Sequence, residues 1–130
     1  MDTRKPELLA PAGSIEAMNA ALKAGADAVY LGFAAFSARA GAGNFDEEAL
    51  REAIRFAHLH HMKVHVTVNT LVKDEEIPQV VEVLRYLADL CVDAVLVQDM
   101  GVFRLLRQEF PALRIHCSTQ MTLNSEEGVR

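Results

Sequence analysis

The sequence predicts an α/β fold, a partial TIM-type β/α barrel with parallel strands. Short apolar runs alternate with amphipathic stretches along the 130 residues, which is typical of strand–helix–strand units. The Ala-Asp-Ala-Val of residues 26–29 returns as Val-Asp-Ala-Val at residues 92–95, which indicates a repeated unit. Valines alternate with polar residues in the clearest strand, 63–69. An open doubly wound sheet also fits, but its central strands are usually apolar on both faces, so the alternation favours a barrel lumen.

The first elements follow from capping residues and apolar runs. Residues 7–11 form the first strand, and Ser14 is the expected N-cap of a helix that closes at Gly25. The second strand covers 27–32, and a long loop of small residues, 33–44, follows it.

The remaining elements continue the alternation. The second helix is capped by Asp46 and has a buried face of Leu50, Ala53, Ile54 and Ala57. After the strand at 63–69, the third helix carries Ile77, Val80, Val81, Leu84, Leu87 and Cys91 on one face. A strand at 93–97, a helix over about 101–109 and a strand at 114–118 follow, and a fifth helix starts at Asn124 or Ser125. The chain thus supplies about four and a half β/α units, whereas a complete barrel needs roughly 250 residues.

This count predicts that residues 1–130 are the N-terminal half of a barrel domain, truncated from a longer chain. The first and fifth strands would then carry unpaired edges. We therefore expect homodimers that form through these exposed barrel edges.

The composition restricts the class of protein. With 13 Lys+Arg against 18 Asp+Glu, the formal net charge is −5, which gives no strong indication of nucleic-acid binding. No apolar run approaches the roughly 18 residues that cross a bilayer, and the start is polar, so no membrane contact or signal peptide is expected. Two cysteines make no disulfide framework. These features predict a cytoplasmic protein with reduced thiols.

Several segments resemble peptidase family U-32, the collagenase-like protease family. They are Pro6–Ser14, Gly25–Gly32, Arg39 with Asn44-Phe45, Val66–Leu71, Asp93–Asp99 and Ile115–Gln120, in the family's order and spacing. The resemblance covers essentially the whole chain. It implies a β/α barrel and a hydrolase described as a peptidase. Other members resemble oxygen-independent hydroxylation factors that act on RNA or on a quinone precursor and carry an iron–sulfur cluster on four cysteines.

The resemblance implies no cluster in this part of the protein. The family's Gly- and Cys-rich stretch lies beyond the region covered, and neither Cys91 nor Cys117 matches a cluster ligand. We therefore expect no cofactor in this fragment, which alone would be inactive, and an iron–sulfur cluster in the full-length protein. Three functions stay open: a peptidase, part of a hydroxylation factor, and a non-catalytic module that binds a substrate or partner.

Candidate site residues follow from the rule that barrel chemistry lies at the carboxyl ends of the strands. This rule, with the lumen-facing positions just below, selects six substrate-binding candidates: Arg39, His65, Asn69, Asp99, Ser118 and Gln120. A rim of this kind suits a polar or anionic substrate, because an arginine can hold a carboxylate or phosphate bidentately. The competing interpretation is that these side chains only cap helices and satisfy loop amides.

No catalytic residue can be assigned from the sequence. Ser118 lacks a Gly-x-Ser-x-Gly elbow. Cys117 is next to His116, but adjacent strand residues point to opposite faces, so the two cannot cooperate. Cys117 is expected to be a buried apolar-like residue. His58 and His61 share a helix face without a third ligand, and no metal site is predicted.

Overall fold

The computed structural model describes residues 5–38 and 44–130, so the candidate Arg39 lies outside the described residues. Its sheet has five strands: β1 (Leu9–Pro11), β2 (Ala28–Gly32), β3 (Lys63–Val68), β4 (Ala94–Val97) and β5 (Ile115–Cys117). Every neighbouring pair is parallel, and the spatial order β1-β2-β3-β4-β5 is the order along the chain. This sequential order distinguishes a β/α barrel from a doubly wound sheet, whose strand order reverses.

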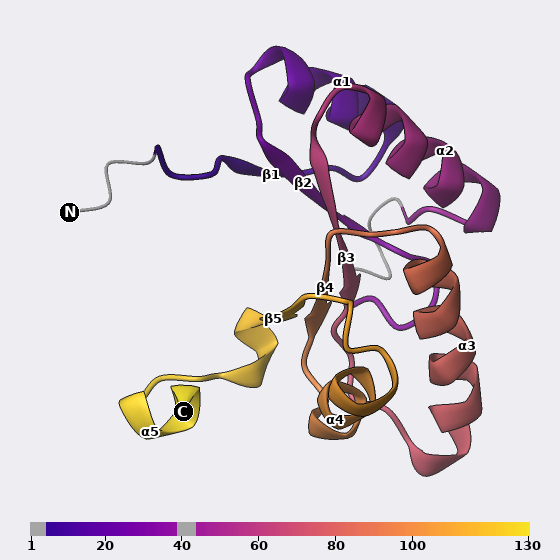
Figure 1. Cartoon of the computed structure of the whole chain (residues 1–130), viewed down its shortest axis with the longest axis vertical. Coiled ribbons are helices and arrows are strands. Elements are labelled where there is room, and N and C mark those ends of the chain that lie inside the picture. Colours follow the sequence, from indigo (N-terminus) through magenta and orange to yellow (C-terminus); the bar gives the residue numbers. More distant parts are fainter. Residues whose placement is uncertain (1–4, 39–43) are drawn as a thin grey trace.

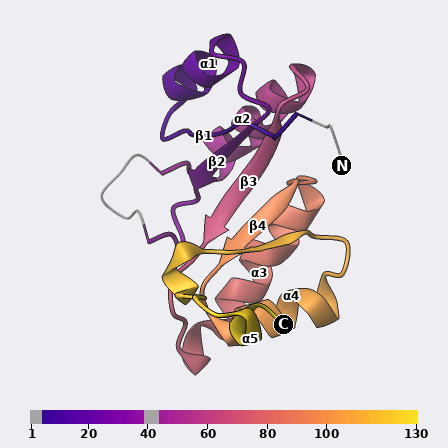
Figure 2. The same ribbon diagram turned by 90° about the vertical axis from the view of Figure 1, so that its left-hand side faces the viewer.

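The helices alternate with these strands. They are α1 (Ile15–Lys23), α2 (Glu47–Leu59), α3 (Ile77–Asp89), α4 (Met100–Glu109) and α5 (Glu126–Val129), with short 3-10 turns η1 (Asp74–Glu76) and η2 (Thr119–Met121). Right-handed crossovers that all advance in one direction place their helices on one face of the sheet. Figure 1 shows α1, α2 and α3 on one side, and Figure 2 looks onto the opposite face. The predicted partial barrel of parallel strands is therefore confirmed.

Side-chain caps begin the helices where the sequence predicts. The Ser14 Oγ accepts a hydrogen bond from the Ala17 N–H at 3.2 Å, and the Asp46 Oδ1 accepts one from the Ala49 N–H at 2.9 Å. Each cap satisfies a donor that the helix itself leaves free. Gly25 follows α1 with φ +81°, a left-handed conformation that glycine adopts without a Cβ clash.

One helix ends earlier than its apolar pattern suggests. Cys91 is predicted on the buried face of the third helix, but α3 ends at Asp89 and Cys91 is exposed. Its φ of +56° places it in the left-handed turn that leads into β4. The prediction is wrong because Leu90 already serves as the C-cap, and a residue beyond the cap no longer follows the helical period.

The core lies between the sheet and the helices. Val64, Val66 and Val68 of β3 are all buried, which confirms the period of two in this strand. Each of the first four helices contributes a large side chain with no exposed surface: Met18, Leu50, Leu84 and Leu106. The four apolar residues predicted for the inner face of α2 are buried as well.

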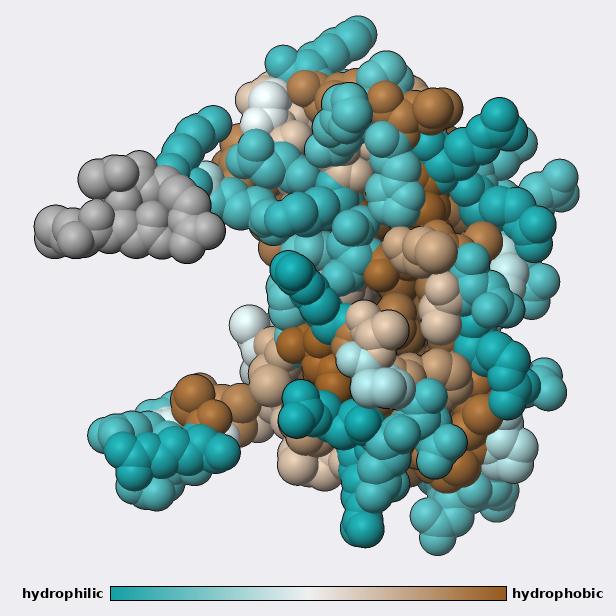
Figure 3. Space-filling model, viewed as in Figure 1, coloured by the Kyte–Doolittle hydropathy of each residue, from teal (hydrophilic) through white to brown (hydrophobic). Residues whose placement is uncertain are grey.

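Both edge strands of the five-stranded sheet pair on one side only. Leu8, which precedes β1, and Leu9, its first residue, are 49% and 40% exposed. Figure 3 shows further apolar surface among the polar side chains. Homodimer formation through these edges stays a prediction, which sedimentation velocity tests. Within 5–38 and 44–130, no helix is long and apolar enough to cross a bilayer.

Candidate functional site

Polar side chains from distant segments meet at the carboxyl ends of β2, β3 and β5. We call this set the rim network: Ser37, Thr67, Asn69, Ser118 and Gln120. The Ser37 and Thr67 hydroxyl oxygens are 3.0 Å apart, and the Thr67 hydroxyl donates to the Leu31 carbonyl at 3.3 Å. Because the Thr67 proton is used in that bond, the Ser37 hydroxyl is the donor between the two.

Asn69 is the central member of the rim network. Its Oδ1 accepts from the Ala38 N–H at 3.0 Å, and its Nδ2 donates to the Ser118 Oγ at 3.2 Å. The Ala38 N–H can only donate, so it fixes which way the amide points. The side chain therefore ties the loop after β2 to the end of β5, and Asn69 and Ser118 are 9% and 7% exposed.

Gln120 contributes its backbone to the rim network. Its N–H donates to the Ser118 Oγ at 3.3 Å, and its carbonyl accepts from the Gln98 Nε2 at 3.4 Å. Gln120 is exposed at the surface of the rim. Gln120 lies at the carboxyl ends of the strands, as expected from the barrel rule that selected it. Its contact with a substrate stays a prediction.

Asp99 also lies at this end of the sheet, but backbone donors occupy its carboxylate. Its Oδ1 accepts from the N–H groups of Gly101 and Val102 at 2.7 and 3.1 Å, and its Oδ2 accepts from the Val72 N–H at 3.3 Å. These bonds cap α4 and hold the loop that follows β3. Asp99 thus has the capping geometry of the competing interpretation, and its contact with a substrate stays a prediction.

His65 lies below the rim, toward the amino ends of the strands. Its ring meets the ring of His116 edge to face, with centroids 4.8 Å apart, and its Nε2 is 4.0 Å from the Glu7 Oε1. Its side chain is 4% exposed. Burial, followed by the nearby His116, lowers the pKa of His65 below the usual histidine value. His65 therefore lies with His116 and Glu7, apart from Asn69 and Ser118 of the rim network.

The lowered pKa of His65 should make folding stability depend on pH. The unfolded chain takes up a proton at this imidazole before the folded chain does, so its contribution is complete above about pH 6.5 and is lost as the pH falls through the folded pKa. Urea unfolding between about pH 5 and pH 8 should show a shallower loss in His65→Gln than in the wild type. The exposed His60→Gln control should keep the wild-type slope.

Gly32 at the end of β2 leaves no room for a side chain beside the rim. A Cβ there would lie 2.3 Å from the Asn44 Oδ1 and 2.7 Å from the Ser37 Oγ. Gly32→Ala should therefore lower the free energy of unfolding by about 1–3 kcal/mol in a urea titration. Gly128→Ala is the matched control, since its new Cβ would approach no closer than 3.2 Å; an equal loss in both variants would show that the rim contact does not matter.

The described residues place no base beside a nucleophile at the rim. The two groups that approach the Ser118 Oγ, the Asn69 amide and the Gln120 N–H, are donors, so neither can remove its proton. Cys117 is in register with Val97 and thus faces the helix side, yet it is exposed, which corrects the expectation of a buried residue. Apolar periodicity alone does not reveal that the described residues leave Cys117 uncovered.

The two thiols do not suit a four-cysteine cluster. Cys91 precedes β4 at the amino ends of the strands, whereas Cys117 closes β5 at the carboxyl ends. Among the described residues, no three His, Cys, Asp or Glu side chains are arranged to hold a metal ion. No chemical step in this part of the protein is therefore assigned to a cluster.

Sequence reasoning missed two contributors to the rim. Ser37 and the Ala38 N–H lie in the loop after β2, where no periodic pattern marks a position. The only indication was that loop's unusual length and its small residues. Their partners, Thr67 and Asn69, are recognisable because they end the strongly alternating strand.

A sequential parallel sheet with a polar rim at its carboxyl ends defines the chain as part of a β/α-barrel protein. The sequence profile of peptidase family U32 matches residues 13–130. The chain belongs to this family, which confirms the resemblance.

Individual relatives carry two kinds of name. The chain is 35% identical over 128 residues to tRNA hydroxylation protein P1 of Bacillus subtilis, covering 98% of this chain and 30% of that protein. It is 35% identical over 130 residues to a 23S rRNA 5-hydroxycytidine synthase of Escherichia coli, covering 100% of this chain and 19% of that protein. A solved structure of a U32 peptidase shares the fold, with a TM-score of 0.77, 16% identity, and coverage of 98% of this chain and 54% of that one.

Proposed function

We propose that this chain is the N-terminal half of the barrel of an RNA-hydroxylating enzyme, and that its rim network, with the neighbouring Gln98, forms the site for the target nucleobase. The observation that carries the proposal is the chemistry of the rim: amide and hydroxyl groups around Asn69 and Ser118, without a nucleophile and base in contact among the described residues. The relatives named for hydroxylation of tRNA and 23S rRNA support the substrate class.

A nucleobase suits such a rim for a physical reason. Base edges present hydrogen-bond donors and acceptors side by side, and proteins read unstacked RNA bases through these edges. Enzymes that modify a base place it in a pocket away from its neighbours. The exposed Gln120 and the partly buried Gln98 each carry both a donor and an acceptor at this mouth. These two side chains would recognise the base, while Asn69 and Ser118 would hold the loops in place.

Affinity for the RNA backbone would come mainly from other parts of the protein. The net charge of −5 makes the chain as a whole a poor binder of phosphates. Arg39, in the loop after β2, is our candidate for a single contact with a phosphate or carboxylate. The iron–sulfur cluster that the family resemblance implies for the full-length protein would be held by cysteines outside this chain.

Peptidase activity is the second candidate, because the family and its solved member are named for it. It would need a base that reaches Ser118 or Cys117 from outside the described residues. Gelatin digestion by the full-length protein, with Ser118→Ala and Cys117→Ala variants, tests this candidate. Loss of digestion in either variant would support proteolysis. A substrate- or partner-binding module without catalysis would digest nothing and modify nothing.

Deleting the gene in its native host tests the proposed hydroxylation. We expect one hydroxylated nucleoside to disappear from digested tRNA or rRNA, measured by liquid chromatography with mass spectrometry, and to return when the full-length gene is restored. A nucleoside profile that is unchanged in both RNA fractions would refute the proposal. The tRNA and rRNA fractions are analysed separately, so the experiment also identifies the substrate.

A further inference from the structure

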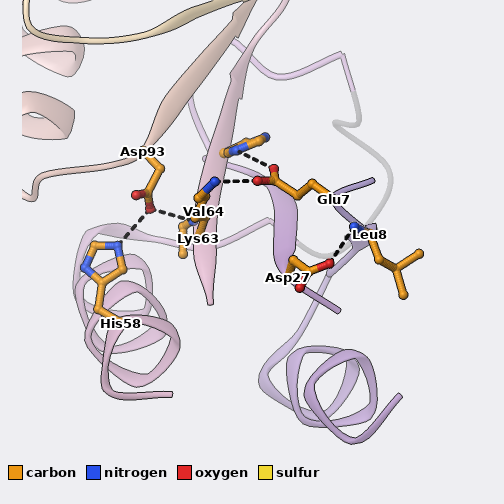
Figure 4. A network of polar contacts seen from close by, with 8 residues as sticks. Glu7, Leu8, Asp27, His58, Lys63, Val64 and Asp93 are labelled. Carbon is orange, nitrogen blue, oxygen red and sulfur yellow. Dashed lines mark hydrogen bonds and ion pairs between the residues drawn. The ribbon is translucent and has the colours of Figure 1, made fainter. Parts of the chain in front are cut away.

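A polar cavity of about 280 Å³ lies at the amino ends of the strands, opposite the rim network. Six residues line it: Glu7, Lys63, His65, Asp93, Arg114 and His116. Lys63 begins β3, whereas Asp93 and Arg114 directly precede β4 and β5. We call it the amino-end cavity. Figure 4 shows part of its polar lining.

The two carboxylates of the amino-end cavity already have partners. Glu7 forms an ion pair with Lys63. The Asp93 Oδ2 accepts from the Val64 N–H at 2.8 Å and lies 2.9 Å from the His58 Nε2 (Figure 4). Both negative charges are thus used in binding the strands together, and neither is left over for a bound cation.

Two basic side chains of the amino-end cavity, Arg114 and His65, are less fully paired than its carboxylates. Within the described part of the chain, Arg114 has no carboxylate within 4.0 Å. The Nδ1 of His65 is buried without a hydrogen-bond partner there, on a side chain that is 4% exposed. Its Nε2, at 4.0 Å from the Glu7 Oε1, is too far for a hydrogen bond. A buried nitrogen without a hydrogen-bond partner lowers the stability of the fold unless another group supplies that hydrogen bond.

We propose that the amino-end cavity binds a small oxyanion, a carboxylate or a phosphate group, with Arg114 as its main ligand and His116 and His65 beside it. The guanidinium offers a planar pair of donors that matches either group. Arg114 and His116 are two residues apart at β5, so they project to the same face, and His116 contacts His65. This site is distinct from the rim and does not depend on the proposed function.

The anion should bind more tightly as the pH falls from about 8 to about 6, because it favours the protonated form of the His65 imidazole. Burial, followed by the nearby His116, lowers the pKa of His65, and an anion beside the ring would offset both effects. The other charged or titratable groups that line or flank the cavity are Glu7, Lys63, His58, Asp93 and Arg114.

Titration of the chain with inorganic phosphate and, separately, with malonate tests the site. Amide shifts are followed by NMR at about pH 6 and constant ionic strength. We expect saturable binding of at least one anion, with the largest shifts near residues 63–65 and 114–116. Binding of phosphate alone would identify a phosphate ligand, and binding of malonate alone a carboxylate.

Arg114→Ala should weaken this binding at least about tenfold, because it removes the guanidinium with its charge and its planar pair of donors. Arg104→Ala makes the same change on α4, outside the cavity, and should leave the affinity unchanged. Arg114→Lys keeps the positive charge but not the planar pair of donors, so its affinity for the anion should lie between those of the two alanine variants. Absence of saturation by either anion, or equal weakening by both alanine variants, would overturn the proposal. Far-UV circular dichroism confirms that each variant is folded.

Discussion

Leu84→Ala should lower the free energy of unfolding by about 2–5 kcal/mol. Leu84 lies on the inner face of α3 and has no exposed surface. Removing its terminal carbons leaves a cavity between α3 and the sheet, which the surrounding side chains fill only in part. Because a domain of this size is stable by only about 5–15 kcal/mol, the loss is a large fraction of the total. Urea unfolding followed by circular dichroism measures it.

Leu59→Ala is the matched control for this substitution. Leu59 ends α2 and is 70% exposed, so the same truncation removes little buried surface and should cost less than about 0.5 kcal/mol. A loss at Leu84 no larger than the loss at Leu59 would mean that α3 does not pack on the sheet as described.

The fold was largely predictable because its determinants are local. The alternating valines of β3 and the helix caps Ser14 and Asp46 act through residues only a few positions away. Cys91 shows where this approach fails, since an apolar side chain after a helix cap continues the pattern without belonging to the helix. The order of strands follows from the chirality of successive crossovers rather than from any single segment.

The candidate site was predictable only in outline. The strand-end rule selects Asn69 and Ser118, which the structure brings together, yet their hydrogen bond depends on the register between β3, β4 and β5, which no local pattern shows. The alternation of β3 places His65 in the lumen below the rim, but it does not show that the ring contacts His116 and approaches Glu7. No sequence pattern marks Arg114 as a ligand, because the relevant feature is three-dimensional: no carboxylate of the described residues lies within 4.0 Å of it.

The barrel geometry explains why two separate polar sites form. Side chains on the lumen face of β3 alternate with buried valines, so Lys63, His65 and Thr67 lie at successive heights along one strand. Thr67 reaches the rim network, whereas Lys63 and His65 line the amino-end cavity. A change at one end of β3 can therefore be tested without directly altering the other end.

Asn69→Ala in the full-length protein should reduce the hydroxylated nucleoside at least about tenfold, if the rim holds the base as proposed. The substitution leaves the Ala38 N–H and the Ser118 hydroxyl without their shared partner, so the loop after β2 is no longer tied to β5. A shift of about 1 Å in groups that position a substrate is enough for a large loss of rate. The measurement is the fraction of modified nucleoside in RNA from a deletion strain that carries the variant gene.

Asn19→Ala separates this effect from a general effect of losing an asparagine. Asn19 is half-buried on α1, away from the rim, and its Nδ2 donates to the Ile15 carbonyl at 3.1 Å, so its loss should leave modification at the wild-type level. Melting temperatures show whether either variant is destabilised. A pure stability defect in Asn69→Ala would also be rescued by growth at lower temperature, whereas a loss of positioning would not. Full modification by Asn69→Ala would remove the rim network from the reaction while leaving the hydroxylation itself to be decided by the gene deletion.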